Sequence, residues 1–197
     1  MFTPHITTKT VTDNSVQIVK NVRGLSNLEV YVGIPEASAA RKGKETITNA
    51  QLAFIHTHGV RTIDARRRMG AMMLNRKIDY GAAQKLFMQS KGAMAFAIPP
   101  RPIIEPAIES EDNQAAIVAE LKDAAQHQLD GDQPGAIRGM KRAGQEAENR
   151  VKAWFTDPRN KWAPNAPSTI ARKGSSRPLI STGALRAAIR WVLGTKG

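Results

Sequence analysis

The amino-acid sequence predicts an α+β domain in which a small mixed or antiparallel sheet packs with a helical hairpin. Residues 28–34 place their most apolar side chains at every second position, and residues 189–193 can place three large apolar side chains on one face in the same way, which is the pattern of a half-buried strand. Residues 111–155 carry two long amphipathic helical patterns, and the turn-forming stretch DGDQPG separates them. An extended arm and an inserted helical segment complete the predicted architecture.

Length and composition favour a single domain over residues 1–197. The chain has 41% hydrophobic residues and no cysteine, so it can bury a core but cannot form disulfides or thiolate metal sites. Its start lacks the apolar core of a signal peptide, and no apolar run approaches the ~18 residues of a membrane span. We therefore expect neither a secretion signal nor a membrane partner.

Charge is distributed unevenly along the chain, whose formal net charge is +12. Residues 61–77 hold six basic side chains and one acidic, residues 103–133 hold one basic and eight acidic, and residues 134–197 hold thirteen basic and three acidic. A chain with an acidic middle and a basic end can pair head to tail with copies of itself. It can equally present a basic face to DNA.

The N-terminal part predicts an arm, a strand and a loop. Residues 1–14 are polar and without period, as in a flexible or partner-bound arm. The first strand places its apolar side chains on one face and ends at Pro35, and residues 36–47 look like a loop. The apolar face of this strand consists of Leu28, Val30, Val32 and Ile34.

Three further helical segments are expected before the middle of the chain. Thr48 or Asn49 can cap a short helix that Gly59 ends. Asp64 can cap a second helix inside an insertion predicted at residues 61–94, and residues 82–91 form a third helical piece. The second helix carries an apolar cluster, for which a core position is favoured over an interface: Met69, Met72, Met73 and Leu74.

Residues 95–108 combine a short strand at Phe96 and Ile98 with extended backbone, because proline fixes φ and biases its predecessor away from helix. Pro106 is well placed in the first turn of the helix that follows. The hairpin then has one broad stripe, formed by Ile117, Val118, Leu121, Ala124, Ala125 and Leu129. Its second helix has a narrow heptad-like seam, formed by Ile137, Met140, Gly144, Ala147, Val151 and Trp154.

The C-terminal part predicts a short helical turn, a short helix and a last strand. Ser168 or Thr169 starts the turn, which ends at residues 173–174, and the short helix covers residues 184–189. The strand places three side chains on one face: Ile189, Trp191 and Leu193.

The sequence offers no enzyme chemistry and no cofactor site. It contains neither a glycine-rich phosphate loop nor a nucleophile elbow around a serine. His56 and His58 do not suggest a metal site, because two residues on a helix lie about 200° apart and no third ligand is near in sequence. Four carboxylates at the start of the hairpin fit helix-dipole compensation better than acid–base catalysis: Glu105, Glu109, Glu111 and Asp112.

A basic cluster is the main candidate for contact with DNA or with a partner. Phosphate contacts by such side chains give a salt-dependent affinity that is blind to sequence. Pairing with the acidic segment 103–133 of a neighbouring subunit is the favoured alternative, because aromatic side chains are not interleaved with the basic ones. The cluster comprises Arg61, Arg66, Arg67, Arg68, Arg76 and Lys77.

Three pieces of sequence, in order, resemble the tail-completion or neck proteins of long-tailed bacteriophages. The first is VYVGIPE (30–36) with NAQLAFIHTHGV (49–60), the second is IPPRPIIEPAI (98–108), and the third is WAPNAPSTIARKGSSRPLISTGALRAAIRWVL (162–193). They cover about half of the chain. Ser181 stands where an acidic residue is common in that family, and Ile103 stands where an aromatic one is common. The insertion 61–94 has no counterpart in the resemblance.

The resemblance implies a scaffold role for the residues that match its motifs. Arg101 would lie in a rigid proline-flanked turn and fork onto carbonyls or a carboxylate, Thr182 would cap the last helix, and Gly183 would allow tight packing. The matching residues are Gly33, Pro35, His56, Gly59, Pro100, Arg101, Pro102, Pro106, Pro178, Leu179, Thr182, Gly183, Leu185 and Ile189.

The resemblance also implies a function. We expect a structural virion protein, made in the bacterial host cytoplasm, that forms a cyclic homo-oligomer at the head-to-tail junction. A hexameric ring is favoured over a twelve-fold one. The implied partners are portal or connector proteins, tail terminator, tube or sheath proteins, and the double-stranded DNA that passes through. The alternative is a basic DNA-binding protein of phage or prophage origin.

Overall fold

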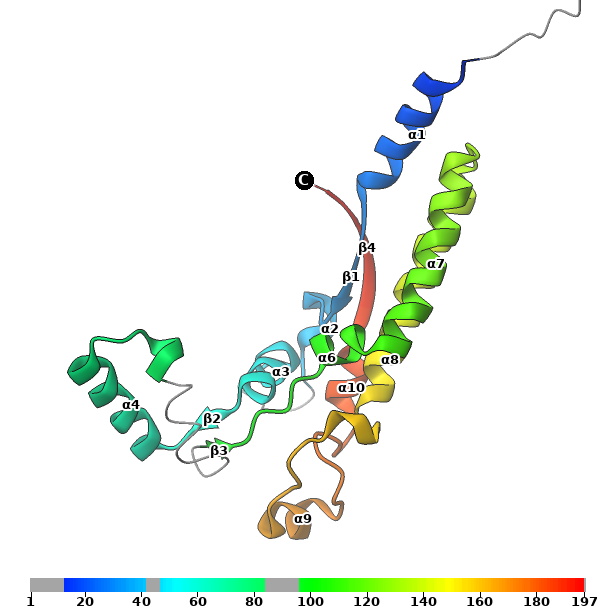
Figure 1. The fold of residues 1–197 in the computed structure, drawn as a ribbon. Helices are drawn as coiled ribbons and strands as arrows, with labels where there is room; N and C mark the ends of the chain where they lie inside the picture. Colours follow the sequence, from blue (N-terminus) through cyan, green and yellow to red (C-terminus); the bar gives the residue numbers. More distant parts are fainter. Residues whose placement is uncertain (1–12, 42–46, 84–95, 197) are drawn as a thin grey trace, which may run out of the picture.

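The computed structural model describes residues 13–41, 47–83 and 96–196. It has the α+β fold that the sequence predicts. A hairpin of two long helices runs along one side, a two-stranded sheet lies beside it, and helix α4 extends away from both (Figure 1). Most of the predicted arm and of the helical piece 82–91 lies outside the described residues.

The N-terminal half holds mostly short elements, and the C-terminal half holds the long hairpin. The described elements are, in order, α1 (Ser15–Ser26), β1 (Leu28–Gly33), α2 (Glu36–Ala39), α3 (Asn49–His58), β2 (Val60–Arg61), α4 (Ile63–Arg76), β3 (Phe96–Ile98), α6 (Ile104–Glu109), α7 (Glu111–Leu129), α8 (Gln133–Trp154), the 3-10 turn η2 (Pro158–Asn160), α9 (Pro167–Lys173), α10 (Ala184–Ala188) and β4 (Arg190–Thr195).

The main sheet pairs β1 with β4, the two strands nearest the ends of the chain. They are antiparallel, with Val30 opposite Leu193 and Val32 opposite Trp191. Their apolar face packs on α8 where Gly144 leaves room, since a Cβ there would lie 2.7 Å from the Trp191 ring. Both strands and the close approach at Gly144 are confirmed. A second antiparallel pair joins β3 to β2. The short strand β3 was predicted, whereas β2 and its pairing with β3 were not.

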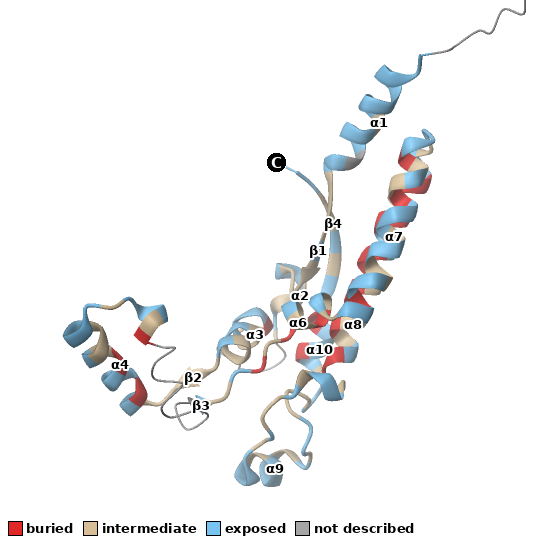
Figure 2. Ribbon diagram, viewed as in Figure 1, coloured by how far each residue is buried: buried red, intermediate tan, exposed pale blue. Residues whose placement is uncertain are grey.

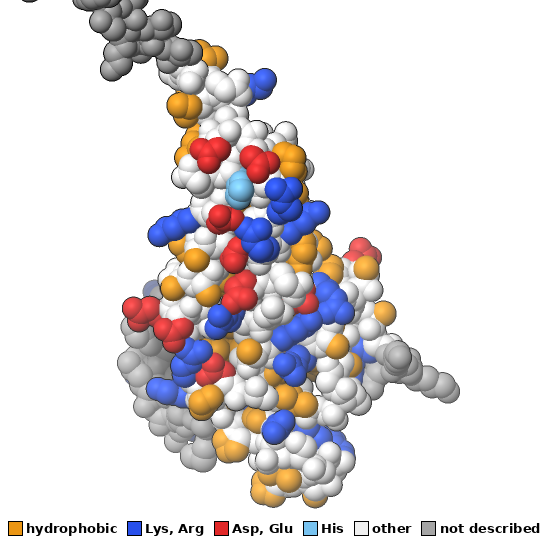
Figure 3. Space-filling model, turned by 90° about the vertical axis from the view of Figure 1, so that its right-hand side faces the viewer, with side chains coloured by type: hydrophobic (Ala, Val, Ile, Leu, Met, Phe, Trp, Pro, Cys, Tyr) orange, Lys and Arg blue, Asp and Glu red, His pale blue; other side chains and the backbone are white. Residues whose placement is uncertain are grey.

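The helical hairpin is confirmed with nearly the predicted boundaries. Asp132 caps α8 by accepting a hydrogen bond from the Gly135 N–H at 2.9 Å. Between the two helices, the Arg142 guanidinium bonds Glu120 at 2.7 Å and also contacts Asp123. Figure 3 shows acidic and basic side chains adjoining on the face of the molecule that it presents. Part of the acidic segment is thus neutralised within the same chain.

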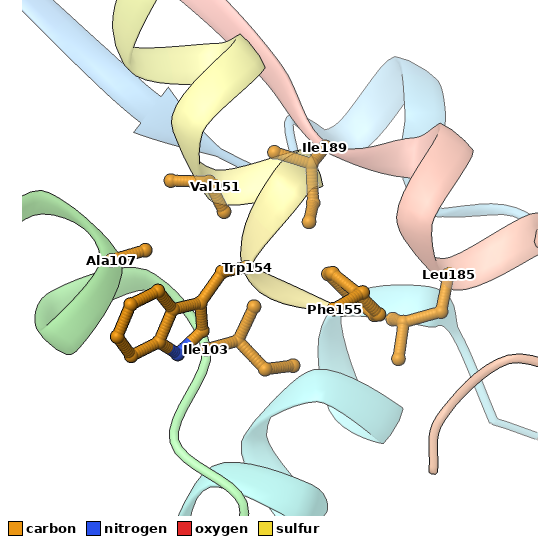
Figure 4. Close-up of a cluster of buried hydrophobic side chains, with 7 residues drawn as sticks. All are labelled: Ile103, Ala107, Val151, Trp154, Phe155, Leu185 and Ile189. Carbon is orange, nitrogen blue, oxygen red and sulfur yellow. The ribbon is translucent and has the colours of Figure 1, made fainter. Parts of the chain in front are cut away.

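The hydrophobic core lies at the end of α8, where α6, α10 and the C-terminal segment meet it (Figure 2). Phe155 points toward Leu185, and Trp154 lies against Ile103 (Figure 4). Burial of apolar surface stabilises a fold by roughly 25 cal/mol per Å², so this cluster anchors the segments that surround it. Its fully or nearly fully buried members are Ile103, Ala107, Val151, Trp154, Phe155, Leu185 and Ile189.

Several local predictions are wrong. Residues 36–39 form the short helix α2 rather than loop. The cap of α4 is Thr62, whose side chain accepts from the Ala65 N–H, and Asp64 lies inside the first turn. Threonine and aspartate are both residue types that cap helices. Because α4 already includes Ile63, its cap is Thr62 and not Asp64.

The apolar stripes are buried only in part. On α4, Met69 is buried but Leu74 is 81% exposed. On α7, the buried residues are Asn113, Ala124 and Gln128. Three residues of the predicted stripe are instead exposed: Val118, Leu121 and Leu129. The seam on α8 is confirmed, since its members from Met140 onward are buried.

Candidate functional site

Arg101 joins the three segments that carry the resemblance. It follows β3 in the extended proline-flanked stretch, and only 5% of its surface is exposed. Its Nε and Nη2 atoms donate to the Ala163 carbonyl at 3.0 and 2.8 Å, and Nη2 also donates to the Pro164 carbonyl at 3.1 Å. Its backbone N–H donates to the His56 carbonyl at 2.6 Å. The predicted fork of Arg101 onto carbonyls is confirmed.

Local geometry at the end of α3 brings the first segment to Arg101. Thr48 and Gln51 form a capping box that fixes the start of the helix. Gly59 ends it with φ 70° and ψ 173°, a region that is essentially restricted to glycine. This conformation turns the chain sharply into β2 and leaves the His56 carbonyl available to Arg101.

The second and third segments also meet at Trp162. Its Nε1–H donates to the Pro102 carbonyl at 3.0 Å, and its ring meets Phe155 edge-on at 5.7 Å. Leu185 and Ile189 complete the same core. Side chains and carbonyls from residues far apart in sequence therefore hold one another in place.

Other scaffold residues have roles that differ from the predictions. Gly183, not Thr182, is the N-cap of α10, and it has φ 78°. A Cβ at Gly183 would meet nothing within 4 Å, so its positive φ rather than tight packing requires glycine. Thr182 contributes through Oγ1, which accepts from the Ala184 N–H at 3.3 Å.

The remaining scaffold residues lie at the borders of elements. Gly33 ends β1 opposite Arg190, and Pro35 precedes α2. Pro106 lies in the first turn of α6, as predicted. The carbonyl of Pro178 accepts a hydrogen bond from the Ile180 N–H at 2.8 Å. Pro100 is exposed in the extended stretch before Arg101.

A groove of about 810 Å³ opens beside Arg101, between α3, the end of β3, α9 and the segment before α10. We call it the basic groove. Among the described residues, no aspartate, glutamate, phenylalanine, tyrosine or tryptophan lines it. Its cationic or titratable members are Arg41, His56, Arg101, Arg172 and Lys173, and its aliphatic walls include Leu52, Ile98, Leu179 and Leu185.

The electrostatics of the groove disfavour further positive charge. Burial lowers the pKa of His56, and the charges of Arg101 and Lys173 lower it further. Burial, followed by the charge of Arg101, lowers the pKa of Lys173, and burial lowers that of Arg101. The Nδ1 atom of His56 is buried without a hydrogen-bond partner among the described residues. The groove therefore has the electrostatic character of an anion site.

The basic cluster from the insertion lies elsewhere, on and around α4. Five of its members are exposed on this helix and its C-terminal turn, where Arg68 pairs with Asp64 at 2.9 Å. Arg61 lies on β2 with its guanidinium over the Tyr80 ring, 5.0 Å from the centroid. The exposed members are Arg66, Arg67, Arg68, Arg76 and Lys77.

Glu148 is an interior charge that the sequence did not reveal. It is 6% exposed and accepts from the Trp191 N–H at 2.9 Å, while Lys152 and Arg190 pair with its other oxygen. Burial acts to raise the pKa of Glu148, but Lys152, the Trp191 N–H and Arg190 outweigh it, so the pKa is lowered. The only available signal was Lys152, four residues further along the helix.

Within the part of the chain that the structure describes, no three His, Asp or Glu side chains are grouped to hold a metal ion. No helix of that part is long and apolar enough to cross a membrane. Comparison of the chain with protein-family models, curated proteins and solved structures gives no match.

Proposed function

We propose that this chain is a structural, non-enzymatic virion protein that forms a ring at the head-to-tail junction of a long-tailed bacteriophage. The observation that carries the proposal is the convergence at Arg101. Three segments with the order and motifs of tail-completion proteins are joined there by hydrogen bonds to His56, Ala163 and Pro164. Motif residues that hold one another in this way are a scaffold, which is the role that the resemblance assigns to them.

Exposed apolar side chains on α1 support assembly. This helix projects beyond the sheet (Figure 1), and α7 adds exposed apolar residues next to it. Exposed apolar side chains on neighbouring helices are available for protein–protein contact. They comprise Val16, Ile18, Val19 and Val22 on α1, together with Val118, Leu121 and Leu129 on α7.

The β1–β4 sheet also favours assembly. It has two strands within the described residues, and α8 covers one of its faces. A two-stranded sheet is marginal alone, and its outer edges present unpaired backbone groups to other chains. Tyr31 and Val192, which are 51% and 44% exposed, lie on the other face. Contacts between such edges and the α1 surface of the next copy would be heterologous, and contacts of this type form a ring where the rotation from copy to copy closes.

The test combines mass measurement with partner binding. We would record native mass spectra of the purified chain, alone and after co-expression with the connector and tail-tube proteins of a long-tailed phage that carries this chain. The expected result is a cyclic oligomer, alone or on one of these partners. The double substitution Val16→Ser and Val19→Ser should weaken assembly, whereas Ile170→Ser, which removes an exposed apolar residue of α9, should not. A monomer that binds none of these proteins would overturn the proposal.

A second candidate function, binding of double-stranded DNA, is favoured by α4. Its arginines are exposed on a helix that extends away from the rest of the molecule (Figure 1). Contacts with phosphates would give an affinity that falls steeply with salt. Replacing Arg66, Arg67 and Arg68 with glutamate should abolish duplex binding in an electrophoretic shift assay. If assembly of particles fails while duplex affinity is unchanged, this candidate is excluded.

A further inference from the structure

We propose that the basic groove is a binding site for an extended peptide segment of a partner protein, one that carries carboxylates between aliphatic side chains. The proposal stands on the chemistry of the groove and does not depend on ring formation. Its volume of about 810 Å³ lies within the ~300–1,000 Å³ of ordinary ligand clefts. Each feature of the occupant follows from one property of the lining.

The positively charged side chains that line the groove favour an anionic occupant. Arg101, Arg172 and Lys173 line the groove, and no described carboxylate does. Among the described residues, the Arg101 guanidinium donates to carbonyls, whose partial charges do not neutralise it, and the Lys173 ammonium donates to the Arg177 carbonyl. Arg172 is exposed and adds a further positive charge to the lining. A buried or half-buried cation without a counter-charge is costly. A carboxylate supplied by a partner would relieve that cost through charge-assisted hydrogen bonds.

The aliphatic side chains of the groove favour a partner peptide with apolar side chains next to its carboxylate. Leu52, Ile98 and Leu185 line the groove beside the cations. Leu179 joins them with φ 58°, a conformation in which a bulky residue is strained and which is common where a ligand is held. A simple inorganic anion would leave these walls uncovered, whereas an Asp or Glu flanked by Leu or Ile would satisfy both parts of the surface.

Nucleic acid fits the groove less well than a peptide does. A duplex is a rigid convex rod, which suits an exposed helix such as α4 better than a groove between α3, α9 and the segments beside them. Single strands are held mainly by stacking of bases on aromatic side chains, and no phenylalanine, tyrosine or tryptophan lines the groove among the described residues. The observations therefore favour an acidic peptide over DNA.

Ser181 provides a test that leaves the framework intact. It is exposed and lines the groove, so Ser181→Asp places a carboxylate of the chain itself among the cations. That carboxylate should compete with an incoming anion. Ser181→Asn has nearly the same shape without the charge and is the matched control.

The experiment is an NMR titration of the ¹⁵N-labelled full chain with an end-capped Ser-Leu-Asp-Ile-Glu-Leu-Ser peptide. Shifts should be confined to residues of the groove, and a peptide with Asn and Gln in place of Asp and Glu should bind at least tenfold more weakly. Ser181→Asp and the pair Arg172→Ser with Lys173→Gln should each weaken binding at least tenfold. Ser181→Asn should weaken binding much less than Ser181→Asp does, and the pair Lys122→Gln with Lys141→Gln, which removes two charges from the hairpin, should leave binding unchanged.

Three outcomes would overturn the proposal. The first is equal binding of the acidic and neutral peptides, or of wild type and Ser181→Asp. The second is displacement of the peptide by a 12-base-pair duplex from the groove, which would assign the site to nucleic acid. The third is self-association of the chain that Ser181→Asp abolishes, which would make a second copy the occupant. Circular dichroism of every variant separates loss of binding from loss of fold.

Discussion

The guanidinium of Arg101 donates to the carbonyl of Ala163, a residue 62 positions further along the chain. The bond is short, at 2.8 Å from Nη2, and Arg101 is almost fully buried. A buried cation satisfied by backbone carbonyls is a structural part of the fold, because removing it leaves those carbonyls without donors. The same residue also borders the groove, so its structural role has to be measured separately from any role in binding.

Arg101→Met tests this structural role. Methionine keeps an apolar stem of similar length but cannot donate to Ala163 or Pro164. Hydrogen bonds that involve a charged group contribute about 1.5–3 kcal/mol each, and we expect the free energy of unfolding to fall by roughly 2–4 kcal/mol. Urea denaturation followed by circular dichroism measures it. Arg172→Met, on the exposed side of α9, is the control and should change stability by less than ~0.5 kcal/mol.

Gly139→Ala tests the contact between the two helices of the hairpin. An added Cβ would lie 2.7 Å from the Ala124 Cβ and 2.8 Å from the Ala124 Cα. The backbone of α7 cannot turn aside as a flexible side chain can, so the helices must separate, and overpacking of this kind costs about 1–3 kcal/mol.

Gly70→Ala is the matched control for that substitution. Gly70 also lies inside a helix, α4, but a Cβ there would meet nothing within 4 Å. Alanine has the higher helix propensity, by about 0.8–1 kcal/mol, so this variant should be neutral or stabilising in the same urea titration. Equal losses for both variants would show that the spacing at Gly139 has no special importance.

The predicted elements succeeded where periodicity was strong. The hairpin and both strands of the main sheet have patterns long enough to fix their type and their apolar face. The cap of α4 and helix α2 were missed because several neighbouring residues satisfy the same short-range rules. The exposure of Val118 and Leu121 could not be predicted. An apolar stripe on a helix does not reveal whether another element of the same chain packs against it.

The candidate site was predictable only in part. The flanking prolines indicated that Arg101 would be held rigidly and could fork onto carbonyls, which is confirmed. The basic groove depends on four segments that only the tertiary structure brings together, and Arg172 and Lys173 belonged to no predicted site. Glu148 was missed for the same reason, because its partners Trp191 and Arg190 come from the opposite end of the domain.

Glu148→Gln tests the buried charge that links α8 to β4. Glutamine can still accept from the Trp191 N–H but loses the attraction of Lys152 and Arg190. Because the pKa of Glu148 is lowered in the folded chain from its ordinary value of 4.5, its charge stabilises the fold above that pH. This contribution is lost as the pH falls through the lowered pKa.

We therefore expect Glu148→Gln to lower the free energy of unfolding by roughly 1–3 kcal/mol at pH 7. The difference from wild type should shrink steadily below pH 4.5. Urea titrations at pH 7 and at pH 3 measure it. Glu146→Gln, which removes a more exposed partner of Arg150, should have a smaller effect at pH 7. A difference for Glu148→Gln that is independent of pH would show that shape rather than charge matters at this position.

His56 should make the fold sensitive to mild acid. Its pKa is lowered from the ordinary value of 6.5 by burial and by the charges of Arg101 and Lys173. Below pH 6.5 the unfolded chain binds a proton that the folded chain resists, so stability falls as the pH decreases from 6.5 toward the lowered pKa. Carboxylates with ordinary pKa values remain charged over most of this range, so their contribution is small.

The measurement is the free energy of unfolding at pH 7.5 and at pH 5.5 for wild type and His56→Gln. Wild type should lose stability over this interval, and the variant, which has no proton to gain at this position, should lose less. His58→Gln, at an exposed position in the last turn of α3, serves as the control for removal of a histidine. Addition of the acidic peptide to wild type should reduce the loss at pH 5.5, because a carboxylate among Arg101 and Lys173 would favour the protonated imidazole. An identical pH dependence of His56→Gln and wild type would exclude His56 as the source.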